Sequence, residues 1–328
     1  MFAGRGSKRV AQMARRHPSL GSSSIAVTAE TWHRVVDHMD LPEVSPRAHR
    51  RGALWGVALV KDEEDVIEAV IRHHFAQGLD AIVVADNGST DSTPAILRRL
   101  RHEFPLYIAR DRLFAYEQAA KLSCLAHLAG AARAGWVVPF DADEFWFGAA
   151  GGRLGHTLRS TDDDVTVLSA EMHNVFPLAG LAPGATLGER EFRLCLHPSS
   201  HMKVAFRPHP DAMLSMGSHD VARTGERALG LTLLHLPWRS REQMATKARK
   251  GVAALDAGRL APEVGHHWRT LAAGGEEGFD AVWAAITSGV DVPGLEWGPE
   301  APMVITRPFN PAQHWYHEVR PGAADANP

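Results

Sequence analysis

The chain has 328 residues, of which 45% are hydrophobic and 22% are charged, and its formal net charge at pH 7 is −3. This length allows one large α/β domain with a tail, or two small domains. The slightly negative charge argues against a general nucleic-acid-binding protein, because such proteins are usually basic. Two cysteines, Cys124 and Cys195, are too few for a disulfide framework or a cysteine zinc site. They fit a reducing cytoplasm, with a single disulfide as the alternative.

Residues 1–50 are rich in Ser, Pro and Arg, and we expect them to be irregular apart from a short helix over 30–39. The first 25 residues carry five Lys or Arg side chains and no acid. They lack the apolar core of a secretory signal, and no run of about 18 apolar residues predicts a transmembrane helix. We predict a disordered segment; the alternative is a weak electrostatic contact with the anionic inner face of a membrane.

From residue 54 onward, apolar runs alternate with helical patterns. Strands are predicted over 54–60, 81–85, 105–109 and 136–140, and helices over 66–75, 93–101 and 117–134. This alternation predicts an α/β fold with a mostly parallel central sheet and right-handed crossovers. Asp62 is a candidate N-cap of the first helix, and Gly78 and Gly135 are candidate helix ends. Further strands are predicted over 165–170, 202–206, 212–216 and 231–236, followed by C-terminal helices over 241–257 and 276–287.

Ligands of such sheets bind at the carboxyl ends of the strands. Those ends here carry Lys61-Asp62-Glu63-Glu64, the stretch from Asp86 to Thr93, and Asp141-Ala142-Asp143-Glu144. Two aspartates separated by one residue can face one small volume, and carboxylates are ligands that Mg²⁺ and Mn²⁺ prefer. An acidic surface turn is the alternative for this motif alone.

Taken together, the three motifs and their order resemble family 2 glycosyltransferases of the GT-A fold, over residues 54–255. The stretch IRHHFAQGLDAIVVADNGSTDST, residues 71–93, resembles a bacterial branch similar to family 92. The resemblance implies a Rossmann-like nucleotide-sugar-binding domain at 51–260 and a helical or irregular extension at 261–328. It further implies an enzyme that uses Mn²⁺ or Mg²⁺ to move a sugar from a UDP-sugar to an acceptor hydroxyl. UDP-GlcNAc is favoured over UDP-glucose and UDP-galactose.

The resemblance also implies roles for individual residues. Glu63 and Asp86 are expected to hold the uridine, and Lys121 to contact the nucleotide. Asp141 is expected near the ribose and the metal, and Asp143 as the ligand of the metal that bridges the diphosphate. Many relatives have Asn where this chain has Asp62, which is therefore left outside the site.

Two histidines are candidates to complete the metal shell: His219, in Gly217-Ser218-His219-Asp220, and the alternative His235. An inverting transfer also needs a general base on the acceptor side. We predict Asp220 for this role, with Glu171 as the rival.

Four cations are candidates to line the diphosphate: Lys203, Arg207, Lys247 and Lys250. Lys247 is the one assigned to the nucleotide, because relatives carry a cation late on this helix; a solvated helix face is the alternative.

Two other functions remain open. A nucleotidyltransferase would also use paired aspartates and a metal, but its Gly-rich phosphate loop is replaced here by the acidic Lys61–Glu64 segment. A non-catalytic sugar-nucleotide-binding protein is the second. The acceptor is not identified by the sequence: a small molecule, a lipid-linked sugar and a polysaccharide all fit. No nucleic-acid partner is expected.

Overall fold

The structure is a computed structural model that describes residues 27–45, 50–178, 187, 191–258 and 265–306. The chain divides into two compact units. Unit 1 comprises residues up to Leu113, Glu117–Glu171 and His201–Thr232. Unit 2 comprises Phe114–Tyr116, Met172–Ser200 and the residues from Leu233 onward. The predicted domain boundaries at residues 50 and 260 differ from the boundaries of these two units. The predicted glycosyltransferase domain at 51–260 stays a prediction.

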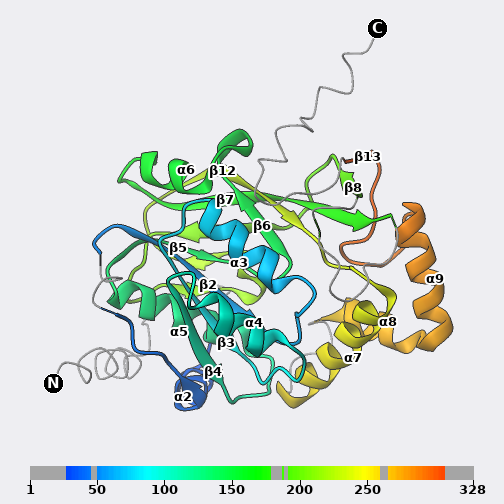
Figure 1. The fold of residues 1–328 in the computed structure, drawn as a ribbon, viewed down its shortest axis with the longest axis horizontal. Helices are drawn as coiled ribbons and strands as arrows, with labels where there is room; N and C mark the ends of the chain where they lie inside the picture. The colour runs from blue at the N-terminus through cyan, green and yellow to red at the C-terminus, as the bar shows by residue number, and fades with distance from the viewer. Residues whose placement is uncertain (1–26, 46–49, 179–186, 188–190, 259–264, 307–328) are drawn as a thin grey trace, which may run out of the picture. The chain divides into compact units, whose positions relative to one another are not determined.

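Unit 1 is built on a mixed sheet in the strand order β1-β4-β3-β2-β5-β9-β7-β12-β6 (Figure 1). The strands are β1 Met39–Asp40, β2 Ala53–Val60, β3 Ala81–Asp86, β4 Leu106–Asp111, β5 Ala134–Pro139, β6 Glu144–Phe147, β7 Val165–Pro177, β9 Met202–Phe206 and β12 Glu226–His235. A separate two-stranded sheet pairs β10 Met213–Leu214 with β11 Val221–Ala222. Both β7 and β12 contribute residues to each unit.

The core of this sheet is parallel. β2 pairs with β3 on one side and with β5 on the other, and β3 pairs with β4, all in parallel register. These strands are almost continuously buried, as parallel strands covered on both faces must be. The predicted α/β fold with a parallel core is therefore confirmed. The strands added around it are antiparallel, since β1 pairs with β4 and β9 with both β5 and β7 in that sense.

Helices cover the two faces of the parallel core. The helices of unit 1 are α2 Ala29–His38, α3 Ile67–Ala76, α4 Thr93–Leu100, α5 Gln118–Ala131 and α6 Leu154–Ser160. On one face, α5 and α2 share a hydrophobic core with the side chains of Trp55, Val57 and Val83. On the other face, His74 of α3 stacks on Phe140 with 4.0 Å between ring centroids. Figure 1 shows α3 and α4 in front of the sheet on this side.

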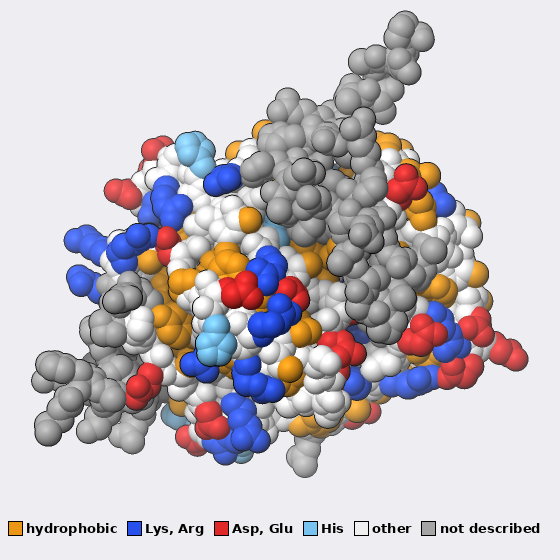
Figure 2. All heavy atoms as spheres, viewed as in Figure 1, with side chains coloured by type: hydrophobic (Ala, Val, Ile, Leu, Met, Phe, Trp, Pro, Cys, Tyr) orange, Lys and Arg blue, Asp and Glu red, His pale blue; other side chains and the backbone are white. Residues whose placement is uncertain are grey.

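The outer surface of α3 and α4 is an ordinary solvated face. Glu68 of α3 pairs with Arg72 at 2.9 Å and with Arg99 of α4, and Arg72 also pairs with Glu103 at 2.8 Å. Figure 2 shows acidic and basic side chains side by side over these two helices. Exposed pairs of this kind each contribute about 0–1 kcal/mol. We therefore assign no binding role to this surface.

Several local expectations need correction. Asp62 does not cap α3, whose N-cap is Val66 without a side-chain hydrogen bond. Helix α5 ends at Ala131 rather than near 134, and Arg133, at φ 70°, turns the chain in place of Gly135. The strand predicted over 212–216 is only the two residues of β10. By contrast, α2 confirms the helix predicted over 30–39, within one residue at each end.

Unit 2 contains α7 Arg241–Gly258, α8 His266–Ala273, α9 Gly275–Ser288, and the strands β8 Phe192–Cys195 and β13 Met303–Ile305. β8 pairs antiparallel with β13 and with the end of β7. The predicted C-terminal helices are confirmed by α7 and α9, while α8 was not predicted. Within the described ranges, no helix combines the length and the apolar character needed to cross a membrane. The predicted disorder of residues 1–25, and the alternative of a membrane contact, concern residues outside the described part of the chain.

Candidate active site

The carboxyl ends of β2, β3 and β5 bring the predicted acidic residues to one edge of the sheet. Glu63 follows β2, Asp86 is the last residue of β3, and Asp141 and Asp143 follow β5. Because β3, β2 and β5 are parallel neighbours, these residues emerge at the same edge. The strand pairing thus brings the chain positions of all four residues to one edge of the sheet, and their assignment to nucleotide and metal stays a prediction.

Hydrogen bonds lock the loops after β2 and β3 together. The Asp62 Oδ1 atom accepts from the Thr90 amide at 2.6 Å and from the Thr90 hydroxyl at 3.2 Å, while the Asp62 amide donates to the Ser89 hydroxyl at 2.9 Å. The Glu63 amide donates to Thr93 Oγ1 at 2.9 Å. Asp62 has φ 55°, a left-handed conformation that Asp tolerates better than most residues. Asp62 therefore braces the loop that carries Glu63.

A buried ion pair lies beneath the loop after Asp86. The Lys121 ammonium pairs with Asp111 at 2.7 Å and donates to the Leu113 carbonyl at 2.6 Å. Asp111 also accepts through Oδ2 from the side-chain amide Nδ2 of Asn87 at 2.6 Å. Burial lowers the pKa of Lys121, and Asp111 opposes this shift. Lys121 is 1% exposed, so its observed contacts are within the protein, and its contact with the nucleotide stays a prediction.

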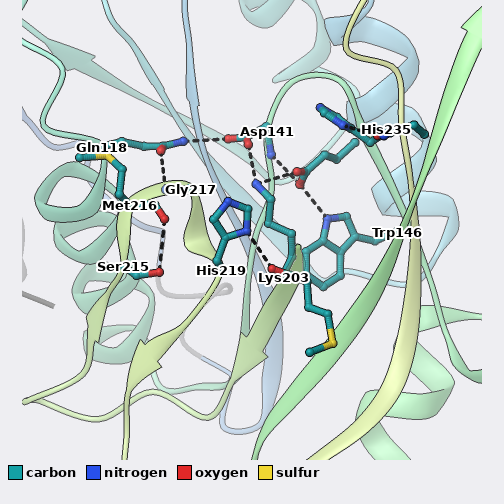
Figure 3. Close-up of polar contacts among 12 residues, drawn as sticks. Gln118, Asp141, Trp146, Lys203, Ser215, Met216, Gly217, His219 and His235 are labelled. Carbon is teal, nitrogen blue, oxygen red and sulfur yellow. Dashed lines mark hydrogen bonds and ion pairs between the residues drawn. The ribbon is translucent and has the colours of Figure 1, made fainter. Parts of the chain in front are cut away.

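Asp141 and Glu144 share one buried lysine (Figure 3). The Lys203 ammonium lies 2.6 Å from Asp141 Oδ2 and 2.7 Å from Glu144 Oε1. The other Asp141 oxygen, Oδ1, accepts from the Gln118 side-chain amide at 3.1 Å. The Glu144 Oε2 atom accepts from the Asp141 amide at 3.0 Å and from Trp146 Nε1 at 3.2 Å. These contacts fix the orientation of the turn that also carries Asp143, which is 2% exposed.

Burial and charge shift the pKa values in this cluster. Burial raises the pKa of the Glu144 carboxyl to about 7, although the Lys203 ammonium opposes the shift. Burial alone would lower the pKa of Lys203, but the carboxylates of Asp141 and Glu144 raise it above its ordinary value. Lys203 is therefore a permanent cation at neutral pH. The sequence placed it along the diphosphate, whereas its observed partners are these two carboxylates.

His219 lies in the turn that joins β10 and β11. Its Nδ1 atom is 2.9 Å from the Met202 carbonyl oxygen. A carbonyl can only accept, so Nδ1 carries the proton and Nε2 presents a lone pair. Burial, followed by the charge of Lys203, lowers the pKa of His219 to about 4, so that the imidazole is neutral at pH 7. This is the tautomeric arrangement that metal-binding histidines use.

The two candidate bases differ in position. Asp220 is exposed, its Oδ1 atom accepts from the Val221 amide at 2.7 Å, and the same atom pairs with Arg227. Glu171 lies opposite Met202 in the β7–β9 ladder, one residue after Ala170, which lies opposite Lys203. Since successive strand residues point to opposite faces, Glu171 is on the face away from the Lys203 ammonium. The geometry thus directs Glu171 away from the Lys203 ammonium, and the base role of Asp220 stays a prediction.

Two predicted residues belong to unit 2. Lys247 is on α7, with its ammonium 5.9 Å from the ring centroid of Trp238. His235 is buried, with Nδ1 3.0 Å from the Asn174 Oδ1 atom and its ring edge-on to Trp297. The proposed diphosphate contact of Lys247 and the metal role of His235 stay predictions. Arg207, in unit 1, donates to the Val165 carbonyl at 2.9 Å.

The side chains at this edge could bind a divalent cation only together with ligand atoms from a substrate. In the part of the chain that the structure describes, no three His, Cys, Asp or Glu side chains gather as a metal cluster. Mg²⁺ sites of phosphate-handling enzymes use one or two carboxylates together with substrate phosphates. Asp143 and the neutral His219 imidazole supply ligands of the right kind, whereas both oxygens of Asp141 are already engaged by Lys203 and Gln118.

Sequence reasoning missed two residues of this site. Gln118 begins α5 and Glu144 begins β6, and neither was predicted to have a role. Glu144 directly follows the Asp-X-Asp motif, so its proximity could have been inferred from spacing. The contact of Gln118 with Asp141 spans 23 residues and has no local signal.

Comparison with known proteins finds a family match over part of the chain. Residues 57–178 match the family model described as glycosyl transferase family 2. Among solved structures, S. aureus TarS 1-349 in complex with UDP-GlcNAc is 15% identical, with a TM-score of 0.35, covering 66% of this chain and 70% of that one. Glucosyl-3-phosphoglycerate synthase from Mycobacterium tuberculosis, in complex with Mn²⁺, uridine-diphosphate and phosphoglyceric acid, is 14% identical, with a TM-score of 0.31, covering 66% and 82%. No curated protein matches the chain.

The matched segment runs from β2 into β7 and contains every predicted acidic residue of the sheet edge. It includes both the parallel strands of the sheet core and the motifs from which we predicted a GT-A fold. Over residues 57–178 the chain is therefore similar to glycosyl transferase family 2, and this similarity supports a glycosyltransferase enzyme.

Proposed function

We propose that the protein transfers a sugar from a UDP-sugar to an acceptor hydroxyl in a metal-dependent reaction that inverts the anomeric centre. The observation that carries this proposal is the convergence of Glu63, Asp86, Asp141 and Asp143 at the ends of three adjacent parallel strands. Glu63 and Asp86 would hold the uridine, and Asp141 the ribose. UDP-GlcNAc is the first donor to test, before UDP-glucose and UDP-galactose. The similarity to the family 92 branch stays part of this proposal.

The metal would be held by Asp143 and His219. When bound, a divalent cation would neutralise the charge that develops on the diphosphate as its bond to the sugar breaks. The protein's own part is to present one buried carboxylate and one neutral imidazole with its Nε2 lone pair available. Lys203 stays with Asp141 and Glu144 and offsets part of their negative charge.

In the transfer step, the acceptor oxygen bonds to the anomeric carbon as the bond from that carbon to the diphosphate oxygen breaks. UDP leaves with the electron pair, and the hydroxyl proton passes to a carboxylate, for which we propose Asp220. The exposed position of Asp220 suits a base that meets a diffusing acceptor. Glu171 is the second candidate. The acceptor class stays open among small molecules, lipid-linked sugars and polysaccharides.

A thermal-shift screen tests the donor class. With Mn²⁺ present, UDP and at least one UDP-sugar are expected to raise the Tm, because a ligand at 100 times its Kd stabilises by about 2.7 kcal/mol. For a domain of this size that is roughly 5–10 °C. GDP-mannose and CMP-sialic acid serve as control donors. Equal shifts with the controls, or no shift with any uridine nucleotide, would contradict the proposed donor.

A nucleotidyltransferase is disfavoured by the segment after β2. There Asp62 accepts hydrogen bonds from the Thr90 amide and hydroxyl, and the Glu64 carboxylate accepts from the Ser92 amide at 2.8 Å. Acidic side chains therefore occupy the place where such an enzyme presents a Gly-rich loop to a triphosphate.

A further inference from the structure

The turn from Ser215 to Asp220 is closed on itself. The Ser215 amide donates to the Asp220 carbonyl at 2.9 Å, and the Asp220 amide donates to the Ser215 hydroxyl at 2.8 Å. Two consecutive residues inside it, Gly217 and Ser218, have φ 69° and 55°. Positive φ at a non-glycine residue costs of order 1–3 kcal/mol and persists only where surrounding contacts enforce it. Ser218 is therefore held in a strained conformation, directly before His219.

One side chain ties this turn to the Asp-X-Asp motif. Gln118 accepts from the Gly217 amide through Oε1 at 2.9 Å and donates through Nε2 to Asp141 Oδ1 at 3.1 Å (Figure 3). Gln118 is 6% exposed and lies at the start of α5, whose residues from 118 to 129 are all buried. A residue so placed has little freedom to move. It holds the two turns at a fixed separation.

The space above Gly217 is filled by the imidazole of His219. A Cβ atom on residue 217 would lie 2.4 Å from His219 Nε2 and 2.6 Å from Cδ2, well inside van der Waals contact. The ring is held on its other side by the Met202 carbonyl, which accepts from Nδ1. Any side chain at position 217 would therefore push the ring away from its present place. The glycine is needed both for its φ and for the room that it leaves.

We infer that Gln118 and Gly217 are positioning residues that hold the His219 imidazole in one orientation beside the Asp-X-Asp turn. Gln118 sets the distance between the two turns, and Gly217 leaves the space that the imidazole ring occupies. This inference depends on the proposed function in one respect only, namely that Nε2 of His219 would be a ligand of the metal. The orientation of the ring itself is a separate claim, and it is measured separately.

Histidine side-chain NMR measures the orientation without substrate or metal. In the wild type, His219 is expected as the Nδ1–H tautomer, with a proton protected from exchange by the Met202 carbonyl. Gly217→Ala and Gln118→Leu are expected to lose that protected signal. Gly52→Ala is the matched control for the first, because Gly52 has φ 79° and a Cβ atom added there would meet nothing within 4 Å. Gln77→Leu is the control for the second, since Gln77 is 3% exposed and its Oε1 accepts from the Leu154 amide at 2.9 Å.

Affinity for UDP with Mn²⁺ measures the consequence. Residues that orient a metal ligand typically change metal affinity by about 10–100-fold when substituted. As a single substitution, Gln118→Leu should therefore weaken UDP·Mn²⁺ binding by about 10–100-fold. In a His219→Ala background it should have almost no further effect, because the residue through which it acts is gone.

The outcomes separate the two claims. Retention of the protected Nδ1–H signal in both Gly217→Ala and Gln118→Leu would overturn the positioning inference, as would its equal loss in the two controls. An equal loss of UDP·Mn²⁺ affinity in both backgrounds would mean that Gln118 affects binding through Asp141, and would overturn the consequence for the metal while the NMR result decides the orientation of the ring. If His219→Ala alone leaves that affinity unchanged, the metal role of His219 fails, and the NMR result still decides the positioning of the ring.

Discussion

Removing the ammonium of Lys203 should cost stability in a pH-dependent way. Lys203→Met keeps much of the side-chain volume but leaves Asp141 and the fully buried Glu144 without their shared cation. Deleting one partner of a buried ion pair costs about 3–5 kcal/mol. Lys203 is 4% exposed and Glu144 is 0% exposed, so we expect this full range at pH 8. For a domain of this size the loss corresponds to a Tm lower by roughly 6–20 °C.

The sign of the pH dependence follows from Glu144. Its folded-state pKa of about 7 lies above the ordinary value of 4.5, so the folded protein binds this proton more tightly than the unfolded chain does. Between those two values stability falls as the pH rises. Without Lys203 the carboxyl is harder still to ionise, so the window extends to higher pH. The destabilisation of Lys203→Met should therefore be smaller at pH 5 than at pH 8.

Urea denaturation at pH 5, 6, 7 and 8 checks this reasoning, with the double variant Lys203→Met/Glu144→Gln as the matched control. Glutamine keeps an acceptor for Trp146 Nε1 and removes the buried charge. The double variant should recover most of the stability at pH 8 and show a flatter pH profile. Equal losses for Lys203→Met at pH 5 and pH 8, or a double variant no more stable than the single one, would refute the account of this cluster.

Four further predictions concern the proposed reaction. Asp143→Asn should weaken UDP binding in the presence of Mn²⁺ but not with chelator, as measured by calorimetry, because it removes a metal-binding charge; equal affinity with Mn²⁺ would remove Asp143 from the metal site. Asp86→Asn keeps the acceptor for the Ser89 amide and should raise KM for every UDP-sugar by a similar factor, whereas a loss confined to one donor would place Asp86 at the sugar. Asp62→Ala should raise the Kd for UDP roughly 10-fold, or about 1.4 kcal/mol, while Asp62→Asn keeps the acceptor and stays near wild type; equal effects would exclude the bracing role. Asp220→Asn should lower kcat by about 10²–10⁴-fold with unchanged donor affinity, and a normal kcat would direct the same test to Glu171→Gln.

The parallel core could be predicted because its strands are continuous apolar runs. β2 and β3 have almost no exposed position, and short apolar runs between turn residues are typical of buried parallel strands. The antiparallel strands were harder. β6 is four residues long and directly follows the Asp-X-Asp turn, and the pairing of β9 with β5 joins residues far apart in sequence. β6 is too short to carry a periodic signal, and β9, although predicted as a strand over 202–206, gave no local sign of its antiparallel partner.

The site divides in the same way. Glu63, Asp86, Asp141 and Asp143 could be assigned because each follows a predictable strand. The residues that orient them could not, because their partners are set by tertiary packing. Lys203 meets Asp141 across 62 residues of chain, and a lysine in a strand pattern ordinarily predicts a solvent-facing position. The prediction that Asp62 caps a helix was wrong for a related reason. Its carboxylate accepts from the backbone amide of Thr90, on the neighbouring loop, rather than from a helix amide.

Metal-dependent release of UDP is the measurement that tests the central claim most directly. The purified protein is incubated with UDP-GlcNAc, UDP-glucose and UDP-galactose in turn, with Mn²⁺, with Mg²⁺ and with chelator, and free UDP is quantified. We predict slow release from at least one donor even without acceptor, dependent on the divalent cation and lost in Asp143→Asn while the variant keeps the wild-type Tm. No release from any of the three donors with either metal, or release that persists equally in chelator and in Asp143→Asn, would contradict the account.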